Sequence, residues 1–343
     1  MNENPTIYFI LTERCNYHCP FCIRENLDKV DQEVSVDDFR SVSLKVHKRF
    51  PDSLLVLTGG ETHIHSSFFR IIDLASSIFK TVVVTTNGSM PDEFIDELLP
   101  FLRKNVYIQL SLDGPEDVHD ALRGRGAFKN CVHCLDSLRV VSDHLIVSST
   151  ITFSTIDSYY ALAEELNQYS FRYLKISPEQ VGNPSVDKLI MPEVWNSFVD
   201  RVLPLCRFHV RIKKLFDFGI MDKYLARNVD PYNDHFTFNC GFGKAKFYIT
   251  PTLDVLPCSC LSDVIGNLKT DSMDCIIDRL NCIGRIIPDI NSLCHSCKYS
   301  CICNGGCPGY SKKVFGDYNR GDLRCPLLRD SYEKYQSIDN GQL

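Results

Sequence analysis

The feature that most constrains the fold is an alternation of short β-rich runs with amphipathic segments long enough for a helix. Six such runs, rich in Val, Ile, Leu and Tyr, follow one another in the N-terminal part of the chain. This repetition predicts a parallel α/β sheet whose strands are joined by crossover helices. The predicted strands are residues 7–11, 54–57, 82–85, 106–110, 145–148 and 173–176.

Three cysteines, Cys15, Cys19 and Cys22, follow the first predicted strand within one short loop. Ligands gather at the carboxyl ends of strands in barrels and in open α/β sheets, so this loop is a candidate site. Zinc usually takes four protein ligands, whereas three thiolates on a four-iron cluster leave one iron open to a small chelating molecule. From the residues alone, a structural zinc site completed by His18 or by a distant residue remains open.

The spacing Cys-x3-Cys-x2-Cys, with Phe21 before the last cysteine, resembles the signature of the radical S-adenosylmethionine (SAM) superfamily. The superfamily's glycine-rich motif resembles residues 58–61, Thr-Gly-Gly-Glu, which follow the second strand. Residues 86–88 and 111–114, followed by His119, Asp120 and Arg123, are also similar to its SAM-binding half-barrel. Each later motif is weak alone, but their order along the chain matches the family.

This resemblance implies a partial (β/α)6 TIM-like barrel with a [4Fe–4S] cluster bound by the three cysteines. The amine and carboxylate of SAM would chelate the open iron, and reductive cleavage of SAM would give a 5'-deoxyadenosyl radical. Small residues let a ligand approach the backbone, and a carboxylate accepts from an ammonium group. No catalytic acid or base is identified. The implied SAM-binding residues are Gly59, Gly60, Glu61, Asn87, Ser111 and Asp113.

Asn87 and Ser111 have an alternative interpretation, in which their side chains cap strand ends or the helices that follow.

The C-terminal part holds a second concentration of cysteines, which taken alone is also compatible with a zinc knuckle. Together with the N-terminal signature it resembles the SPASM domain of peptide-modifying radical SAM enzymes, whose seven-cysteine pattern includes Cys-x2-Cys-x5-Cys-x3-Cys. All seven positions are filled, which implies two auxiliary [4Fe–4S] clusters. One would be bound by Cys294, Cys297, Cys303 and Cys325, and the other by Cys240, Cys258 and Cys307.

The second auxiliary cluster is one ligand short in this pattern. Cys260 could supply the fourth thiolate, although it lies only two residues beyond Cys258. On an extended chain the two Cα atoms would stand roughly 6 to 7 Å apart with their side chains on the same face. An open iron that accepts substrate is the favoured expectation. The pattern also departs from the domain at Asp254, where a glycine is common in the hairpin, but Asp tolerates similar turns.

The other cysteines are expected to be buried without metal, because free cysteine is among the most buried residue types. Cys131 and Cys134 lie in a helical pattern with apolar neighbours at helical spacing, which favours core packing over a further metal site. The remaining members of this group are Cys206, Cys260, Cys275, Cys282 and Cys301.

The resemblance implies hydrogen-atom abstraction from a side chain of a ribosomally made peptide, followed by oxidative modification or crosslinking. The auxiliary clusters would accept the electron that a net oxidation releases. One alternative is maturation of an anaerobic sulfatase, but Ser259 follows Cys258 where those enzymes often carry aspartate. Two others are oxidation of a carbohydrate or aminoglycoside alcohol and a non-catalytic metal-binding scaffold.

The implied partners are a precursor peptide and an electron donor such as flavodoxin or ferredoxin. The first strand begins soon after Met1, too early for an N-terminal winged-helix reader of a leader peptide. A separate protein, the outer surface of the barrel or the C-terminal domain could read the leader instead. The formal charge of -6 and pI of 5.9 predict no nucleic-acid or membrane partner. The basic run 207–214 alternates with apolar residues, which favours a half-exposed strand.

The N-terminus lacks a basic region followed by an apolar run, so the seventeen cysteines are expected to be reduced or metal-bound in the cytoplasm. The predicted domain limits are 1–210 for the radical SAM partial barrel and 211–239 for a bridging region. The SPASM domain is expected over 240–330, and a C-terminal tail over 331–343.

Overall fold

The computed structural model describes residues 1, 3–23, 32–179, 189–226, 240–283 and 293–330. The predicted C-terminal tail lies outside the described residues. Among the described helices, none combines the length and apolar character needed to cross a membrane.

A single ten-stranded sheet runs through the molecule in the order β10-β9-β8-β1-β2-β3-β4-β5-β6-β7. Strands β1 to β8 pair in parallel with their neighbours, while β9 pairs antiparallel with β8 and β10. The strands are β1 (Thr6–Ile10), β2 (Leu54–Thr58), β3 (Val82–Thr86), β4 (Val106–Ser111), β5 (Leu145–Ile151), β6 (Tyr173–Pro178), β7 (Val210–Arg211), β8 (Lys246–Ile249), β9 (Asp254–Leu256) and β10 (Gly266–Asn267).

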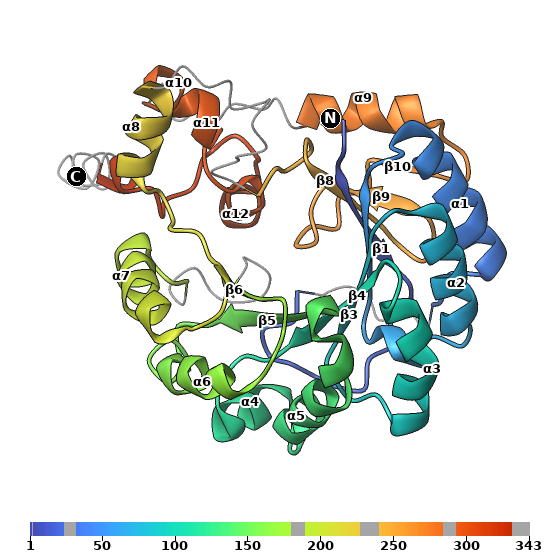
Figure 1. Cartoon of the computed structure of the whole chain (residues 1–343). Helices are drawn as coiled ribbons and strands as arrows, with labels where there is room; N and C mark the ends of the chain where they lie inside the picture. Colours follow the sequence, from blue (N-terminus) through green and yellow to red (C-terminus); the bar gives the residue numbers. More distant parts are fainter. Residues whose placement is uncertain (2, 24–31, 180–188, 227–239, 284–292, 331–343) are drawn as a thin grey trace.

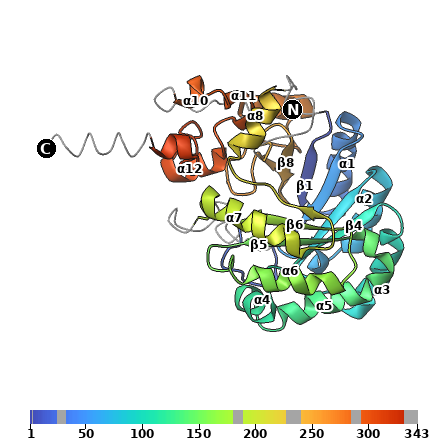
Figure 2. The same cartoon turned by 60° about the vertical axis from the view of Figure 1, so that its left-hand side comes forward.

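All six predicted strands are confirmed as β1 to β6, and the parallel α/β class is confirmed with them. Figures 1 and 2 show the helices around the outside of the curved sheet, with α8 and α10 to α12 gathered at one end. The helices are α1 (Val36–Arg49), α2 (Phe68–Ile78), α3 (Asp92–Leu102), α4 (Glu116–Arg123), α5 (Ala127–Ser137), α6 (Tyr159–Glu165), α7 (Pro192–Val202), α8 (Phe218–Ala226), α9 (Met273–Ile283), α10 (Leu293–Ser296), α11 (Ser300–Cys303) and α12 (Pro308–Phe315).

Successive strand residues face opposite sides of the sheet, and this gives the barrel an outer and an inner face. In β1, Ile7 and Phe9 pack in the main core with Phe39 of α1, and the Phe9 and Phe39 ring centroids lie 4.9 Å apart. Tyr8 and Ile10 face the inner side, where they pack with other strand residues. Burying each large apolar side chain stabilises the fold by about 1.5–3 kcal/mol.

The sheet continues into the part of the chain where the sequence predicts a separate C-terminal domain. Strand β8 pairs in parallel with β1, and Tyr248 stacks on Tyr8 with ring centroids 4.6 Å apart. Phe247 and Ile249 are fully buried in the same core as β1. The hairpin after Cys240 therefore extends the barrel sheet, while the domain limits at 210, 239 and 330 stay a prediction.

One local prediction differs from the structure. In the basic run 207–214, only Val210 and Arg211 form a strand, β7. In the β8–β9 hairpin, the residue with a left-handed backbone is Leu253, whose φ is 68°. Asp254 begins β9, and its backbone N–H donates to the hydroxyl of Thr250 at 3.0 Å.

Candidate functional site

The loop after β1 brings the thiols of Cys15, Cys19 and Cys22 close enough to affect one another's ionisation. The backbone N–H of Cys22 donates to the carbonyl of Cys19 at 3.0 Å, which tightens the loop between them. Cys19 is buried, and the other two are half-buried. Burial raises the pKa of Cys15 and raises that of Cys19 to about 11. Metal binding at this loop must therefore displace protons from the thiols.

Gly59 and Gly60 follow β2 and pack against the segment that leads to Cys15. The N–H of Gly60 donates to the carbonyl of Thr12, and that of Glu61 donates to the carbonyl of Arg14, both at 2.8 Å. A Cβ atom at Gly59 would lie 2.5 Å from the Thr12 carbonyl oxygen, and one at Gly60 would lie 2.0 Å from that of Arg14. In the structure these glycines allow the segment before Cys15 to approach the loop after β2. Their contact with SAM stays a prediction.

Gly60→Ala is expected to destabilise the fold by about 1–3 kcal/mol, because the new methyl group overlaps a backbone oxygen that cannot rotate away. Urea unfolding and iron content after anaerobic reconstitution measure the effect, and iron content should fall because the cysteine loop is displaced. Gly219→Ala in α8 is the matched control, since its Cβ would only touch the Asp217 carboxylate at 3.4 Å. Equal stability and iron content in the two variants would contradict the account.

Glu61 joins the loops after β2 and β3. Its side chain is 2% exposed, and its Oε2 accepts from the backbone N–H of Asn87 at 2.7 Å while its Oε1 lies 3.0 Å from Nδ1 of His63. The amide of Asn87 in turn donates to Oδ1 of Asn16, inside the cysteine loop, at 2.8 Å. The structure thus brings Glu61 and Asn87 together beside the cysteines.

Ser111 and Asp113 lie at the carboxyl end of β4. Ser111 is half-buried, and Asp113 is fully buried. The Asp113 carboxylate accepts from the backbone N–H of Thr150 at 2.8 Å and from Nε of Arg123 at 2.6 Å. Both of its oxygens are therefore engaged, so the influence of Asp113 on the site passes through Arg123.

Arg123 is a functional candidate that is absent from the predicted SAM-binding residues. In the sequence it follows the motif at residues 111–114, which resembles the SAM-binding half-barrel. Its guanidinium carbon lies 5.4 Å from the ring centroid of Phe21, and its charge acts on Cys19. Burial lowers the pKa of Arg123, but Asp113 outweighs this effect and keeps the pKa above its ordinary value. A permanent positive charge therefore stands beside the cysteine loop, where it suits thiolates or a carboxylate.

Cys131 and Cys134 are fully buried on α5, so the prediction of core packing is confirmed for both. The Cys131 thiol donates to the carbonyls of Asn87 at 3.4 Å and Ser111 at 3.3 Å. The same prediction is wrong for Cys282 and Cys301, which are exposed. Cys206 and Cys275 are intermediate.

The C-terminal cysteines gather into two sets. The charges of Cys297 and Cys325 act on Cys294, and those of Cys294 and Cys325 act on Cys303. Burial raises the pKa of Cys294 to about 11 and that of Cys303 to about 12. These four thiols are the set that the sequence assigns to the complete auxiliary cluster.

The second set contains Cys240, Cys258, Cys260 and Cys307. A Cβ on Gly309 would lie 3.6 Å from the sulfur of Cys258 and 3.7 Å from that of Cys307, so the glycine keeps this space narrow. The charges of Cys240 and Cys258 act on Cys307, and burial raises the pKa of Cys307 to about 12.

The chain between Cys258 and Cys260 is not extended. A turn lies there, with the N–H of Leu261 donating to the carbonyl of Cys258 at 3.5 Å. The N–H of Cys260 lies 3.4 Å from the sulfur of Cys258. A hydrogen bond between the two thiols raises the pKa of Cys258 and lowers that of Cys260.

A buried ion pair lies against both sets. Asp322 is 1% exposed, and its carboxylate accepts from Nε and Nη2 of Arg324 at 2.9 and 2.7 Å and from the N–H of Cys307 at 3.3 Å. Its charge also acts on Cys303 and Cys325, which belong to the other set. The sequence offers no signal for this pair beyond its position between two cysteines.

The donor atoms of all three sets are thiols, the soft ligands that iron–sulfur clusters take. Each set is partly or wholly buried, and each thiol comes from a short loop or a helix end. Within the described ranges, no three His, Cys, Asp or Glu side chains lie close enough to hold a single metal ion. His18, the alternative zinc ligand, is exposed. The residues present fit thiolate-bound clusters.

Comparisons with known proteins show similarity to two proteins of Bacillus subtilis. AlbA of Bacillus subtilis, an antilisterial bacteriocin subtilosin biosynthesis protein, is 25% identical over 283 residues, which cover 79% of this chain and 58% of AlbA. SkfB of the same species, a sporulation killing factor maturation protein, is 34% identical over 157 residues, 45% of this chain and 38% of SkfB. The chain thus spans less than two thirds of either relative.

A likeness in three dimensions extends over most of the chain. The crystal structure of SuiB from Streptococcus suis bound to precursor peptide SuiA has a TM-score of 0.74 at 15% identity, covering 94% of this chain and 76% of SuiB. At that identity the likeness concerns the fold. The family model for the radical SAM superfamily matches residues 9–154, the stretch that holds the three-cysteine loop, Glu61, Asn87 and Arg123. Residues 9–154 therefore form a radical SAM domain, and this part of the chain belongs to the radical SAM superfamily.

Proposed function

We propose that this protein is a radical SAM peptide maturase. It binds SAM and a [4Fe–4S] cluster at the loop after β1 and oxidatively modifies or crosslinks a side chain of a ribosomally made peptide. The observation that carries the proposal is the meeting of Cys15, Cys19 and Cys22 with the Glu61–Asn87 network and Arg123 at one edge of the sheet.

When bound, the cluster supplies an electron to SAM, whose cleavage gives methionine and the 5'-deoxyadenosyl radical. The chain's own residues bind and orient SAM. Glu61 lies at 2% exposure next to Asn87, where a carboxylate can accept from the methionine ammonium. Gly59 and Gly60 hold the loop close, and Ser111 offers a half-buried hydroxyl at the end of β4. Arg123, held by Asp113, adds positive charge beside Cys19.

The two C-terminal thiol sets are proposed to bind auxiliary [4Fe–4S] clusters. Abstraction of a hydrogen atom leaves a radical on the substrate, and a net oxidation then requires loss of one electron and one proton. A cluster held by either thiol set would supply an acceptor for that electron, and an external flavodoxin or ferredoxin would exchange it. The thiolate-rich sites suit a reducing compartment, which supports the cytoplasm as the location.

The peptide substrate is supported by the relatives. AlbA acts in biosynthesis of the bacteriocin subtilosin and SkfB in maturation of the sporulation killing factor, and both share sequence with this chain. The sulfatase-maturase alternative is less favoured, because Ser259 occupies the position of the aspartate that those enzymes often carry and is 6% exposed. A leader peptide could be read by a separate partner protein.

A deuterium-transfer experiment tests the substrate class. The reconstituted protein is incubated with SAM, dithionite and either a perdeuterated peptide digest or a perdeuterated carbohydrate mixture, and 5'-deoxyadenosine is analysed by mass spectrometry. Deuterium is expected in the nucleoside only from the peptide digest. Deuterium from the carbohydrate mixture alone would overturn the peptide assignment and favour alcohol oxidation.

Cys260 is proposed as the fourth ligand of the second auxiliary cluster. Its thiol forms a hydrogen bond with that of Cys258, and the charge of Cys307 acts on it. Cys260→Ala is expected to lower iron by up to one cluster, about four of twelve irons per chain. Iron content and Mössbauer spectra measure the loss. Cys275→Ala, on α9, is the matched control and should keep its iron. Unchanged iron in Cys260→Ala would support the open iron instead.

A further inference from the structure

The eight parallel strands contain only three charged side chains, and all three are cations: Lys175 in β6, Arg211 in β7 and Lys246 in β8. This is unexpected in a chain with 43 Asp and Glu residues against 37 Lys and Arg residues. Lys175 and Lys246 are half-buried and Arg211 is exposed. A cation at such a position can bind an anionic ligand through charge-assisted hydrogen bonds.

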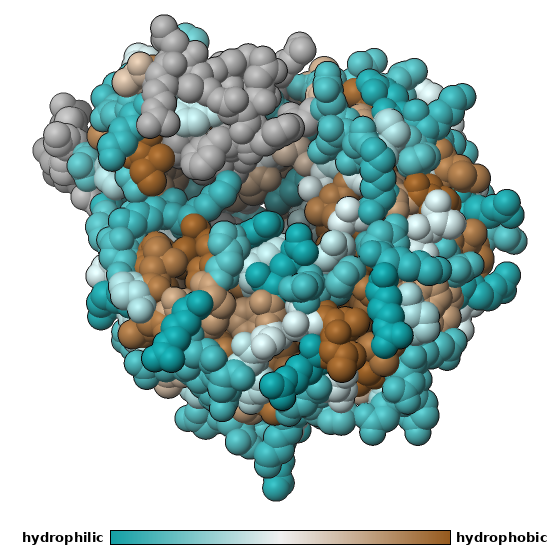
Figure 3. All heavy atoms as spheres, in the orientation of Figure 1, coloured by the Kyte–Doolittle hydropathy of each residue, from teal (hydrophilic) through white to brown (hydrophobic). Residues whose placement is uncertain are grey.

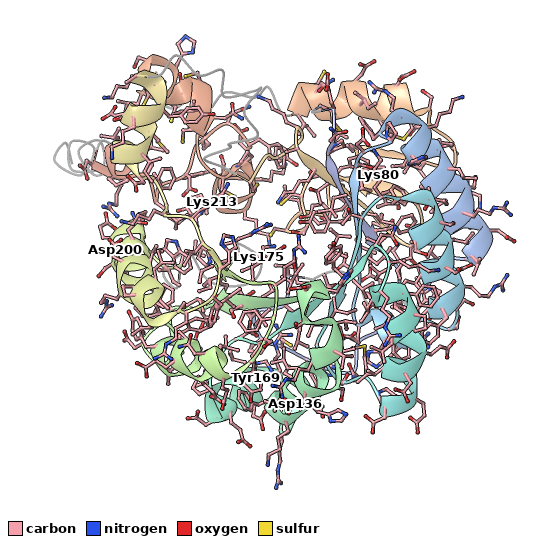
Figure 4. The ribbon with its side chains drawn as sticks, in the orientation of Figure 1. Lys80, Asp136, Tyr169, Lys175, Asp200 and Lys213 are labelled. Carbon is pink, nitrogen blue, oxygen red and sulfur yellow. The ribbon has the colours of Figure 1, made fainter. Side chains whose placement is uncertain are left out.

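All three cations lie on the inner face of the sheet. Leu174, Val210 and Phe247, their neighbours along the strands, pack in the main core that the helices cover. Since alternate residues face opposite sides, the cations project to the other side. Figure 4 shows Lys175 near the centre of the molecule, and the space-filling view in the same orientation is hollowed there (Figure 3).

Lys175 and Arg211 share a cross-strand row with Ser111. The strand register pairs Ser111 with Ser148, Ser148 with Lys175, and Lys175 with Arg211. Neighbouring strands lie ~4.8 Å apart, so the backbone of Lys175 is roughly 10 Å from that of Ser111. The row therefore places positive charge across the inner face from the proposed SAM contact. Lys246 lies at the other end of the face, paired with Thr6, where its charge acts on Cys240 and Cys258.

The two cations of this row make no ion pair among the described residues. The guanidinium carbon of Arg211 stacks 3.8 Å from the ring centroid of Tyr173, which holds it on the inner face. Of the nearby acids, Glu61 bonds Asn87, and Asp113 pairs with Arg123. Glu179 follows β6 four residues beyond Lys175, which is about 13 Å further along an extended chain.

We propose that Lys175 and Arg211 form the binding position for a carboxylate of the peptide substrate, either an acidic side chain or the C-terminal carboxylate. The inference rests on the proposed function and adds that the peptide segment that enters the barrel carries a negative charge. Arg and Lys donate charge-assisted hydrogen bonds to carboxylates, and the Tyr173 ring keeps Arg211 oriented. Because Lys175 and Arg211 lie in the same cross-strand row as Ser111, they bring that segment to the reacting end of the site.

The test uses the reconstituted protein with SAM and three fluorescein-labelled probes in fluorescence polarisation. The first probe is a Gly/Tyr peptide with Glu at every third position and blocked termini. The second carries Gln instead of Glu, and the third is the Gln peptide with a free C-terminal carboxylate. The wild-type protein is expected to bind the Glu probe or the free-carboxylate probe roughly tenfold more tightly than the blocked Gln probe.

The preferred probe identifies the source of the carboxylate. Lys175→Gln and Arg211→Gln are each expected to bring the ratio of the affinity for the preferred carboxylate probe to that for the blocked Gln probe close to one. Lys175→Arg is expected to retain most of the wild-type preference. Lys80→Gln, which removes a 75% exposed cation outside the barrel (Figure 4), should leave the ratio unchanged. Equal binding of all three probes by the wild-type protein, or a ratio that survives in Lys175→Gln and Arg211→Gln, would overturn the proposal.

SAM itself carries a carboxylate, so its binding is measured in the same variants by equilibrium dialysis. The proposal expects Lys175→Gln to bind SAM as the wild-type protein does. If this variant loses SAM affinity while the peptide ratio stays intact, the cations serve SAM and the proposal fails. Formation of 5'-deoxyadenosine in the same preparations tests the proposed function separately. The protein can cleave SAM whether or not it prefers peptides that carry a carboxylate.

Discussion

Simultaneous replacement of Cys15, Cys19 and Cys22 by alanine is expected to abolish 5'-deoxyadenosine formation. The three thiols meet in one loop, beside Glu61 and Arg123, and the four-iron cluster has no other proposed protein ligands there. Without the cluster no electron reaches SAM. The measurement is liquid chromatography of 5'-deoxyadenosine after anaerobic reconstitution and incubation with dithionite and SAM.

A triple alanine variant of Cys206, Cys275 and Cys282 is the matched control, because it removes three thiols that belong to none of the three sets. It should keep SAM cleavage near the wild-type rate. SAM cleavage at the wild-type rate by the Cys15/Cys19/Cys22 variant would show that the cluster is bound elsewhere.

The second large effect is expected at the four-thiol set of the C-terminal part. Replacing Cys294, Cys297, Cys303 and Cys325 by alanine should remove about four of twelve irons per chain and abolish formation of the modified peptide. It should also destabilise this part of the chain, because metal-binding energy is partly folding energy in small metal-rich modules. SAM cleavage should survive, since the N-terminal loop is untouched.

Iron analysis, thermal unfolding and 5'-deoxyadenosine formation on the same preparation separate these effects. The Cys206/Cys275/Cys282 variant again serves as the control. If iron per chain stays at the wild-type value in the four-cysteine variant, the complete auxiliary cluster is not bound by this set.

The strands could be predicted from the sequence because each buries apolar side chains on the face that packs against the helices and is bounded by turn residues. Burial of Cys131 and Cys134 followed from helical periodicity in the same way, because α5 packs one face on the sheet. The three-cysteine loop could be recognised because its spacing is local, within residues 15–22. In each of these cases the signal lies in neighbours along the chain. The grouping of Cys240, Cys258 and Cys307 came instead from the resemblance to the SPASM domain, because these residues are far apart in the sequence.

Long-range pairing was not predictable. The pairing of Lys246–Ile249 with the first strand joins segments more than two hundred residues apart, and no local pattern specifies that register. The roles of Arg123 and Asp322 depend on burial and on partners brought together by folding. The turn between Cys258 and Cys260 likewise has no marker in the letters Cys-Ser-Cys, so the sequence did not distinguish it from an extended chain.

The most direct test of the central claim compares iron-loaded and zinc-loaded forms of the wild-type chain. Protein purified without metal is reconstituted anaerobically with iron and sulfide or with zinc, and each form is incubated with SAM and dithionite. The account predicts 5'-deoxyadenosine from the iron–sulfur form and none from the zinc form. A preparation that holds its full iron and sulfide, binds SAM and yet forms no 5'-deoxyadenosine would contradict the assignment of this chain as a radical SAM enzyme.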